Sequence, residues 1–302
     1  MEVTILKGNE KIACLGPIGA NGYMALLKEW PYIQERNVIF ADMNSDVLDL
    51  VSRGKAEHGI VPIENSIEGY VRGTMSFWIK QRDDRAWILE KSEKEPDVYV
   101  TGELILPISH VIATNGRISF MEIGGVVSHE QAIGQCSEFL KIWALPSERV
   151  NSTSEAAQMV SQDPEYKNFG AITTELASEM YGLQIMGRDI QDCEDNATMF
   201  HKIGREMAPR TGNDKTAIMF WISNEKGTLL RILIAAGIQN IDMSSIHSIP
   251  LGKRMREYAF YIEFDGHRDD EETKATLSIM AAKCDVLVFL GSYPKSQETE
   301  DE

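Results

Sequence analysis

The apolar run at residues 59–63 places the tightest constraint on the fold of this chain. The sequence GIVPIENSIEGYV passes directly from apolar residues into Glu64, Asn65 and Ser66. A continuous apolar run bounded by a turn signal predicts a buried strand, and open α/β sheets bind ligands beyond the carboxyl ends of their strands. We therefore expect these three polar side chains to face a crevice. A helix cap followed by a glycine turn would produce the same local pattern.

Strand-like and helix-like segments alternate ahead of this run. Apolar runs at 11–15 and 37–41 predict strands, and residues 45–53 have the apolar spacing of a helix that ends before Gly54. This βαβαβ order predicts an α/β fold with a mainly parallel sheet.

Three glycines separate the first predicted strand from the helix that follows it: Gly16, Gly19 and Gly22. Glycines here let backbone N–H groups at a helix N-terminus approach an anion, although such glycines can also simply turn the chain. Their spacing is not GxGxxG, and Pro17 removes one N–H donor, so the pattern does not indicate a nucleotide-binding fingerprint.

Two capping boxes mark helix starts in the middle of the chain. Ser128 with Gln131, and Ser152 with Glu155, have the required spacing, so we expect free N–H groups of both first turns near strand ends. The α/β pattern continues with a predicted strand and helix at 168–172 and 174–181.

Two further segments have no predicted catalytic role. Residues 81–97 are rich in charge and predict a solvated connection between elements. His110 lies inside an apolar run, which favours a buried structural histidine over a catalytic one.

The C-terminal third has a different order of elements. Strands are predicted at 216–222, 241–249, 257–264 and 286–290, and helices at 227–236 and 271–282. This βαββαβ order is typical of a ferredoxin-like domain.

Composition narrows the classes of partner. The net charge of −16 argues against nucleic acid and anionic membranes, because 46 Asp and Glu outnumber 30 Lys and Arg. An anionic small substrate would need locally placed cations or backbone N–H groups. The four cysteines form no CxxC pair or Cys–His cluster, so we expect neither a disulfide framework nor a metal site. No signal peptide or membrane-length apolar run is visible, and we expect a cytoplasmic protein.

The stretch VPIENSIEGYV resembles the signature of the prephenate dehydratases, and other blocks of that family occur in the same order along the chain. These blocks are the glycine opening at Gly16, SHEQAIGQC from Ser128, the box at Ser152, GAITTELASEMYGL, and a closing motif containing Asn196, Thr198, Met199 and Phe200. The resemblance implies a catalytic domain at 8–208 with two lobes like those of a periplasmic binding protein, the second lobe spanning about 103–186. Because the first block begins by Gly16, we expect no chorismate mutase segment ahead of it.

The implied reaction converts prephenate to phenylpyruvate, water and carbon dioxide in L-phenylalanine biosynthesis, with no cofactor. In the family, the threonine of the closing motif is regarded as the proton donor to the leaving hydroxyl. The resemblance therefore assigns catalytic roles to Thr198, Glu64, Asn65 and Ser66. It assigns substrate binding to Gly16, Gly19, Ser128, His129, Gln131, Ser152, Thr153, Asn196 and Phe200.

The sequence departs from the family at substrate-binding positions. Ala20, Asn21 and Gly22 replace residues that include hydroxyl groups, and Met199 replaces the arginine regarded as a carboxylate anchor. A thioether cannot supply charge. Two alternatives therefore stay open: a non-aromatising prephenate decarboxylase, and an inactive aromatic-acid or amino-acid sensor. The retained Thr198 favours dehydration, because the decarboxylases lack that threonine.

Residues 213–295 resemble the ACT domain through which these enzymes sense phenylalanine at a subunit interface. The resemblance implies an L-phenylalanine effector and a homodimer or homotetramer. The implied effector residues are Gly227, Thr228, Leu229, His247, Ser248 and Pro250. Because His247 and Ile249 replace a charged pair of the family, we expect weak effector binding.

Overall fold

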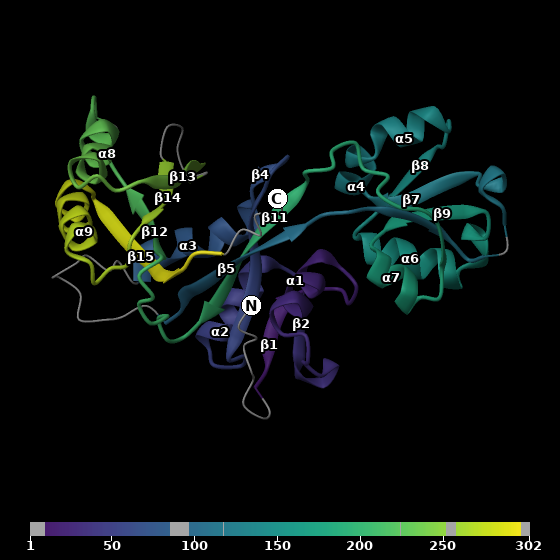
Figure 1. Cartoon of the computed structure of the whole chain (residues 1–302), viewed down its shortest axis with the longest axis horizontal. Coiled ribbons are helices and arrows are strands. Elements are labelled where there is room, and N and C mark those ends of the chain that lie inside the picture. The colour runs from purple at the N-terminus through teal and green to yellow at the C-terminus, as the bar shows by residue number, and fades with distance from the viewer. Residues whose placement is uncertain (1–9, 85–96, 117, 224, 252–257, 297–302) are drawn as a thin grey trace.

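The computed structural model describes residues 10–84, 97–116, 118–223, 225–251 and 258–296 of the 302-residue chain. Three sheets follow one another along the long axis of the molecule (Figure 1). The first and second sheets form the two lobes of an α/β unit, and the third belongs to a C-terminal unit. Within the described ranges, no helix is long and apolar enough to cross a membrane.

The first lobe is built on a sheet with the order β2-β1-β3-β11-β5, to which the short β4 is added through β3. Its strands are β1 (Ile12–Leu15), β2 (Val38–Ala41), β3 (His58–Asn65), β4 (Gly69–Tyr70), β5 (Tyr99–Pro107) and β11 (Ala197–Gly204). Its helices are α1 (Asn21–Glu29), α2 (Asn44–Ser52) and α3 (Arg72–Asp84), with a 3-10 turn at Glu35–Asn37. The parallel pairing of β1 with β2 and β3 confirms the predicted alternation, whereas β11 runs antiparallel to both β3 and β5.

The second lobe has a sheet with the order β10-β6-β9-β7-β8. Its strands are β6 (Val111–Thr114), β7 (Gly125–His129), β8 (Ser147–Val150), β9 (Phe169–Thr173) and β10 (Gln184–Gly187). Its helices are α4 (Glu130–Gln135), α5 (Ser137–Ile142), α6 (Thr153–Gln162) and α7 (Glu175–Met180), with 3-10 turns at Phe120–Glu122 and Pro164–Tyr166.

The predicted start of the second lobe, near residue 103, is wrong. That position falls inside β5, which pairs with β11 and therefore belongs to the first sheet. The chain crosses to the second lobe after Pro107 and returns before Ala197. The two crossing segments are joined where the Ile108 N–H donates to the Asn196 carbonyl at 2.7 Å.

The C-terminal unit has the predicted βαββαβ order. Its elements are β12 (Asp214–Trp221), α8 (Thr228–Ile238), β13 (Met243–Pro250), β14 (Tyr258–Asp265), α9 (Glu271–Lys283) and β15 (Val286–Pro294). Its sheet is antiparallel throughout, with the order β13-β14-β12-β15. This is the ferredoxin-like arrangement.

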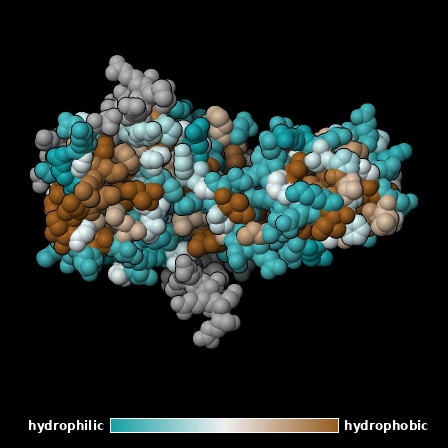
Figure 2. Space-filling model, turned by 90° about the horizontal axis from the view of Figure 1, so that it is seen from above, coloured by the Kyte–Doolittle hydropathy of each residue, from teal (hydrophilic) through white to brown (hydrophobic). Residues whose placement is uncertain are grey.

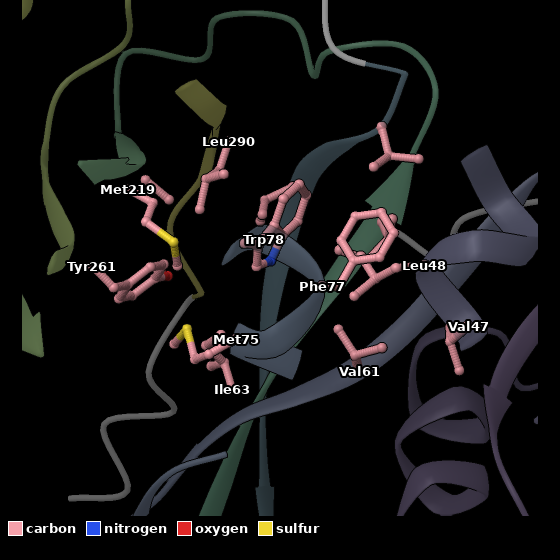
Figure 3. Close-up of a cluster of buried hydrophobic side chains, with 14 of the residues drawn as sticks. Val47, Leu48, Val61, Ile63, Met75, Phe77, Trp78, Met219, Tyr261 and Leu290 are labelled. Atoms are coloured by element: carbon pink, nitrogen blue, oxygen red, sulfur yellow. The ribbon is translucent and has the colours of Figure 1, made fainter. Parts of the chain in front are cut away.

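The two faces of the C-terminal sheet have different partners. One face packs on α8 and α9 through a buried cluster that includes Ile218, Phe264 and Leu277. The other face packs on the first lobe, where Met219 and Tyr261 of the sheet share a core with Ile63 of β3 and with side chains of α3 (Figure 3). Because apolar burial is the main stabilising term in folding, the C-terminal unit and the first lobe are expected to unfold together.

Candidate active site

A cavity of about 300 Å³ lies between the two lobes. The first lobe contributes residues from the β1–α1 loop, the start of α2, and the ends of β3 and β11, and the second lobe contributes α4 and the β8–α6 loop. The lining residues are Leu15, Gly16, Ala20, Asn21, Gly22, Asn44, Pro62, Asn65, Val71, Ile108, His110, His129, Gln131, Ala132, Gln135, Asn151, Ser152, Thr153, Thr198 and Phe200. Carboxyl ends of strands therefore meet at this cavity, as the sequence predicted.

A β-bulge in β3 decides which side chains reach the cavity. Thr198 of β11 pairs with Asn65 and Phe200 pairs with Pro62, so β3 carries one more residue than β11 between these pairs. Regular alternation would place Glu64 on the same face as Pro62. The extra residue reverses the faces beyond it, and Asn65 lines the cavity instead.

Glu64 therefore does not reach the cavity, and its predicted catalytic position is wrong. Its side chain faces the C-terminal unit, where Glu64 Oε2 lies 3.3 Å from Nε2 of His247 on β13. Met199, opposite Glu64 on β11, packs against the core shared with the C-terminal sheet. The position of the family's arginine is thus on the far side of the sheet, and Met199 removes no cation from the cavity lining.

Ser66 is also outside the cavity lining, because its side chain is used to hold the returning chain. Its Oγ accepts from the Ala197 N–H at 3.0 Å and donates to the Asp195 carbonyl at 3.4 Å. The local chemistry predicted a side chain in the crevice, and the structure shows a bridge between two strand ends.

The orientation of the Asn65 amide is fixed by backbone donors. Its Oδ1 accepts from the N–H groups of Ile67 and Glu68, both at 3.0 Å. A backbone N–H can only donate, so the other end of the amide must be Nδ2. That Nδ2 has two protons and three acceptors within reach: Asn196 Oδ1 at 2.8 Å, Thr198 Oγ1 at 3.0 Å and the Ala197 carbonyl oxygen at 3.1 Å.

This geometry determines what the Thr198 hydroxyl can do. An amide NH₂ group cannot accept a hydrogen bond, so Thr198 Oγ1 accepts from Asn65 and keeps its own proton available. Among the described residues, no acceptor for that proton is found. Thr198 is only 8% exposed and lines the cavity, which makes its hydroxyl a donor directed at whatever the cavity holds.

A chain of side-chain hydrogen bonds extends from Asn65 to the second lobe. Asn196, predicted to bind substrate, is buried outside the lining and donates through Nδ2 to Gln135 Oε1 at 3.1 Å. The same Gln135 oxygen lies 2.9 Å from His110 Nε2. His110 is buried and bonded, as a structural histidine would be, but it also lines the cavity. The apolar sequence around His110 did not indicate that it would line the cavity.

The start of α1 supplies backbone donors at Asn21 and Gly22, whereas the Ala20 N–H already donates to the Pro17 carbonyl at 3.1 Å. Ala20 is the N-cap residue, and its methyl group cannot accept a hydrogen bond from the first-turn N–H groups. A Cβ at Gly22 would lie 2.7 Å from the Leu15 carbonyl oxygen, so glycine is what allows α1 to approach β1. Ala20, Asn21 and Gly22, which replace the family's hydroxyl-bearing residues, therefore place the N-terminus of α1 at the cavity.

In the second lobe, one of the two predicted helix caps is confirmed and the other is wrong. Ser152 does cap α6 by accepting from the Glu155 N–H at 3.0 Å, and Thr153 follows it in the lining. Ser128 is not a cap, because it is buried in β7 and its Oγ donates to the Ile172 carbonyl. The cap of α4 is the next residue, His129, whose Nδ1 accepts from the Gln131 N–H.

Gly19, another predicted binding residue, joins the lobes instead of lining the cavity. Its carbonyl accepts from Thr174 Oγ1 of the second lobe at 2.8 Å. A Cβ on Gly19 would lie 3.1 Å from Ser154 Oγ, and its φ of +83° belongs to the left-handed region that favours glycine. This loop therefore joins the two lobes.

The lining combines polar and apolar side chains, and among its described residues it lacks acidic side chains, lysine and arginine. Arg188 lies outside the lining and pairs with Glu175 at 2.7 Å. Two histidines, His110 and His129, are the titratable side chains in the lining.

Comparisons with known proteins agree with this architecture. The sequence model of the prephenate dehydratase family matches residues 12–208. A bifunctional chorismate mutase/prephenate dehydratase from Aquifex aeolicus is 32% identical over 95% of this chain and 74% of its own length. A prephenate dehydratase from Methanocaldococcus jannaschii is 29% identical over 95% and 98%. The solved prephenate dehydratase from Arthrobacter aurescens, in complex with L-Phe, is 26% identical over 94% of this chain and 90% of its own, with a TM-score of 0.80. The chain belongs to the prephenate dehydratase family.

Proposed function

We propose that this protein converts prephenate to phenylpyruvate, water and carbon dioxide, as a cytoplasmic step of L-phenylalanine biosynthesis. The observation that carries the proposal is the Thr198 hydroxyl, which accepts from Asn65 and keeps a free proton at the cavity between the lobes. Family membership supplies the substrate.

The reaction needs one donor at the leaving hydroxyl. Prephenate is a dianion, and the products at neutral pH are a phenylpyruvate monoanion, carbon dioxide and water, so each turnover consumes one proton. The bond from the ring to the hydroxyl breaks, and its electron pair leaves with the oxygen. The bond from the ring to its carboxylate breaks to release carbon dioxide, and the electron pair of this second bond completes the aromatic ring. Thr198 donates to the departing oxygen, and Asn65 holds Thr198 in that orientation.

The remaining lining residues bind substrate in this proposal. The free N–H groups at the starts of α1 and α6 face carboxylate oxygens, together with the side chains of His129, Gln131, Ser152 and Thr153. Gly16 shapes the wall without donating, because its N–H donates to the Ala41 carbonyl at 3.0 Å. Phe200, with Pro62 and Val71, provides an apolar wall for the ring. Asn196 acts indirectly, because its Oδ1 accepts from Asn65.

We further propose that residues 8–208 are the catalytic domain and that residues 213–295 are an ACT domain that binds L-phenylalanine. The ferredoxin-like order of the C-terminal sheet supports this assignment. Gly227 is the left-handed N-cap of α8, which Thr228 begins, and Leu229 packs in the adjacent core. His247, Ser248 and Pro250 lie on edge strand β13.

The C-terminal unit also supports assembly into a homodimer or homotetramer. Leu230, Ile234 and Ile238 follow one another at helical spacing on α8 and are 63%, 46% and 67% exposed. Figure 2 shows hydrophobic residues gathered at the end of the molecule that this unit forms. Such a surface is expected to be covered by a second copy of the chain.

The first prediction concerns the product. Incubation with prephenate at neutral pH should yield phenylpyruvate, identified by mass and ultraviolet spectrum, at a rate above the uncatalysed reaction. A non-aromatic decarboxylated acid would identify a decarboxylase instead. Binding without turnover would identify a sensor.

The second prediction separates Thr198 from its neighbours. Thr198→Val should lower kcat about a hundredfold or more, the contribution of a positioned proton donor, whereas Thr198→Ser should keep most of it. Glu64→Gln and Ser66→Ala should change kcat by less than about tenfold, because both side chains lie outside the cavity. Steady-state kinetics of the four variants provides the test, and a normal kcat in Thr198→Val would refute the assignment.

The third prediction joins effector binding to assembly. Ile234→Glu should dissociate the oligomer in sedimentation experiments and weaken L-phenylalanine binding in calorimetry, because the proposed effector site is shared between two chains. Ile142→Glu, at a residue 77% exposed on the second lobe, is the matched control and should change neither. A wild-type monomer that binds phenylalanine fully would contradict the proposal.

A further inference from the structure

We propose that His110 takes up a proton when the substrate dianion enters the cleft, and that its Nδ1–H then binds one of the substrate carboxylates. This inference rests on the proposed function, because it assumes that the cavity binds prephenate. It assigns a substrate-binding role to a residue that the sequence identified only as structural.

The backbone holds His110 firmly at the boundary between the lobes. It lies on the segment that crosses from β5 to β6 and is 2% exposed. Its N–H donates to Gln191 Oε1 at 2.9 Å, and its carbonyl accepts from the Ile190 N–H on the second crossing segment. These backbone hydrogen bonds therefore fix the position of His110 relative to both segments that connect the lobes.

The hydrogen bonds of Gln135 fix the state of one imidazole nitrogen. Gln135 Oε1 accepts from Asn196 Nδ2 and lies 2.9 Å from His110 Nε2. A carbonyl oxygen can only accept, so His110 Nε2 carries a proton in this arrangement. The second nitrogen, Nδ1, is buried and has no partner among the described residues. It is the atom left for a ligand.

In the free protein this imidazole is held neutral. Burial lowers the pKa of His110, and the hydrogen bond to Gln135 opposes that shift only in part. The nearby acidic groups are already engaged, since Asp189 accepts from Ser109 Oγ and Asp192 accepts from the N–H groups of Ser137 and Glu138. His129, the other histidine of the lining, is occupied as the cap of α4.

The substrate changes this balance because it brings two negative charges into a lining with no Lys or Arg among the described residues. An opposite charge nearby favours the protonated imidazole, which can donate from both nitrogens. The cavity thus gains a cation only when an anion is present and avoids the cost of a buried charge when empty. If Nδ1 stayed unprotonated, it could only accept a hydrogen bond from prephenate. The single donor of prephenate is its hydroxyl group, which Thr198 must protonate.

The test is the pH dependence of kcat/KM for prephenate between pH 7 and 9, where spontaneous aromatisation is slow. Because kcat/KM reports groups of the free enzyme, and His110 is neutral there, the wild-type value should fall about tenfold per pH unit. The pKa of free His110 is lowered, so the fall extends across this whole range. His110→Gln should abolish the slope and lower kcat/KM about 10- to 100-fold at pH 7, the loss expected for one charge-assisted hydrogen bond.

Two variants separate this role from a structural one. Gln at position 110 can still donate to Gln135, so His110→Gln removes the unpaired Nδ1 while retaining the buried hydrogen bond. His129→Asn keeps a good helix cap but cannot titrate, and it should retain the wild-type slope. A slope lost in His129→Asn and kept in His110→Gln would overturn the proposal.

Calorimetry provides a readout that does not depend on turnover. Prephenate binding to the Thr198→Val variant, measured in two buffers of different ionisation enthalpy, should take up about one proton per site at pH 8. The same variant with His110→Gln should take up none. Turnover by the wild type with a flat profile, or with kcat/KM rising with pH, would refute the role of His110 alone. Absence of turnover would instead refute the proposed function.

Discussion

The hydrogen bonds of the Asn65 side chain are the interaction on which the site depends. Two backbone N–H groups fix the amide oxygen, and the amide nitrogen then reaches Thr198 and Asn196. This leaves the Thr198 proton for the cavity and links β3 to the crossing segments between the lobes. All of it requires Asn65 to be on the cavity face, and the bulge at Ile63 places it there. Without the one extra residue in β3, the Glu64 carboxylate would face the cavity in place of the Asn65 amide, and the donor to Thr198 would be lost.

The same two strands present their other face to the C-terminal unit. Glu64 meets His247 there, and His201 of β11, fully buried, lies 2.9 Å from Glu263 of β14. Burial alone would raise the pKa of Glu263, but the hydrogen bond and charge of His201 lower it to about 2. One face of β3 and β11 thus makes charged and polar contacts with the C-terminal unit, and the opposite face of the same strands presents Asn65 and Thr198 to the cavity. This arrangement would give an effector bound to the proposed ACT domain a short physical route to Asn65 and Thr198, through His247 and Glu64.

The sequence was sufficient for the βαβαβ alternation that ends in β3 and for the ferredoxin-like order of the C-terminal unit, because periodicity is a local signal. Motif blocks were sufficient to single out Asn65 and Thr198, both of which line the cavity. The face of Glu64 was not predictable, since the bulge depends on pairing with a strand more than a hundred residues away in the sequence. The cap of α4 was misplaced by one residue because His129, an unusual capping residue, takes the position expected for Ser128. His110 was correctly predicted to be buried, but its unpaired Nδ1 depends on the hydrogen bonds among His110, Gln135 and Asn196, which only the fold brings together.

The central claim is that Asn65 donates to Thr198 and leaves the hydroxyl proton of Thr198 for the substrate. A neutron structure of the deuterium-exchanged protein would locate these atoms directly. The account predicts deuterons on Asn65 Nδ2 directed at Thr198 Oγ1 and Asn196 Oδ1, and a Thr198 deuteron directed into the cavity. A Thr198 deuteron directed at the Asn65 amide would contradict it, because the amide would then be reversed and Thr198 would have no proton to give.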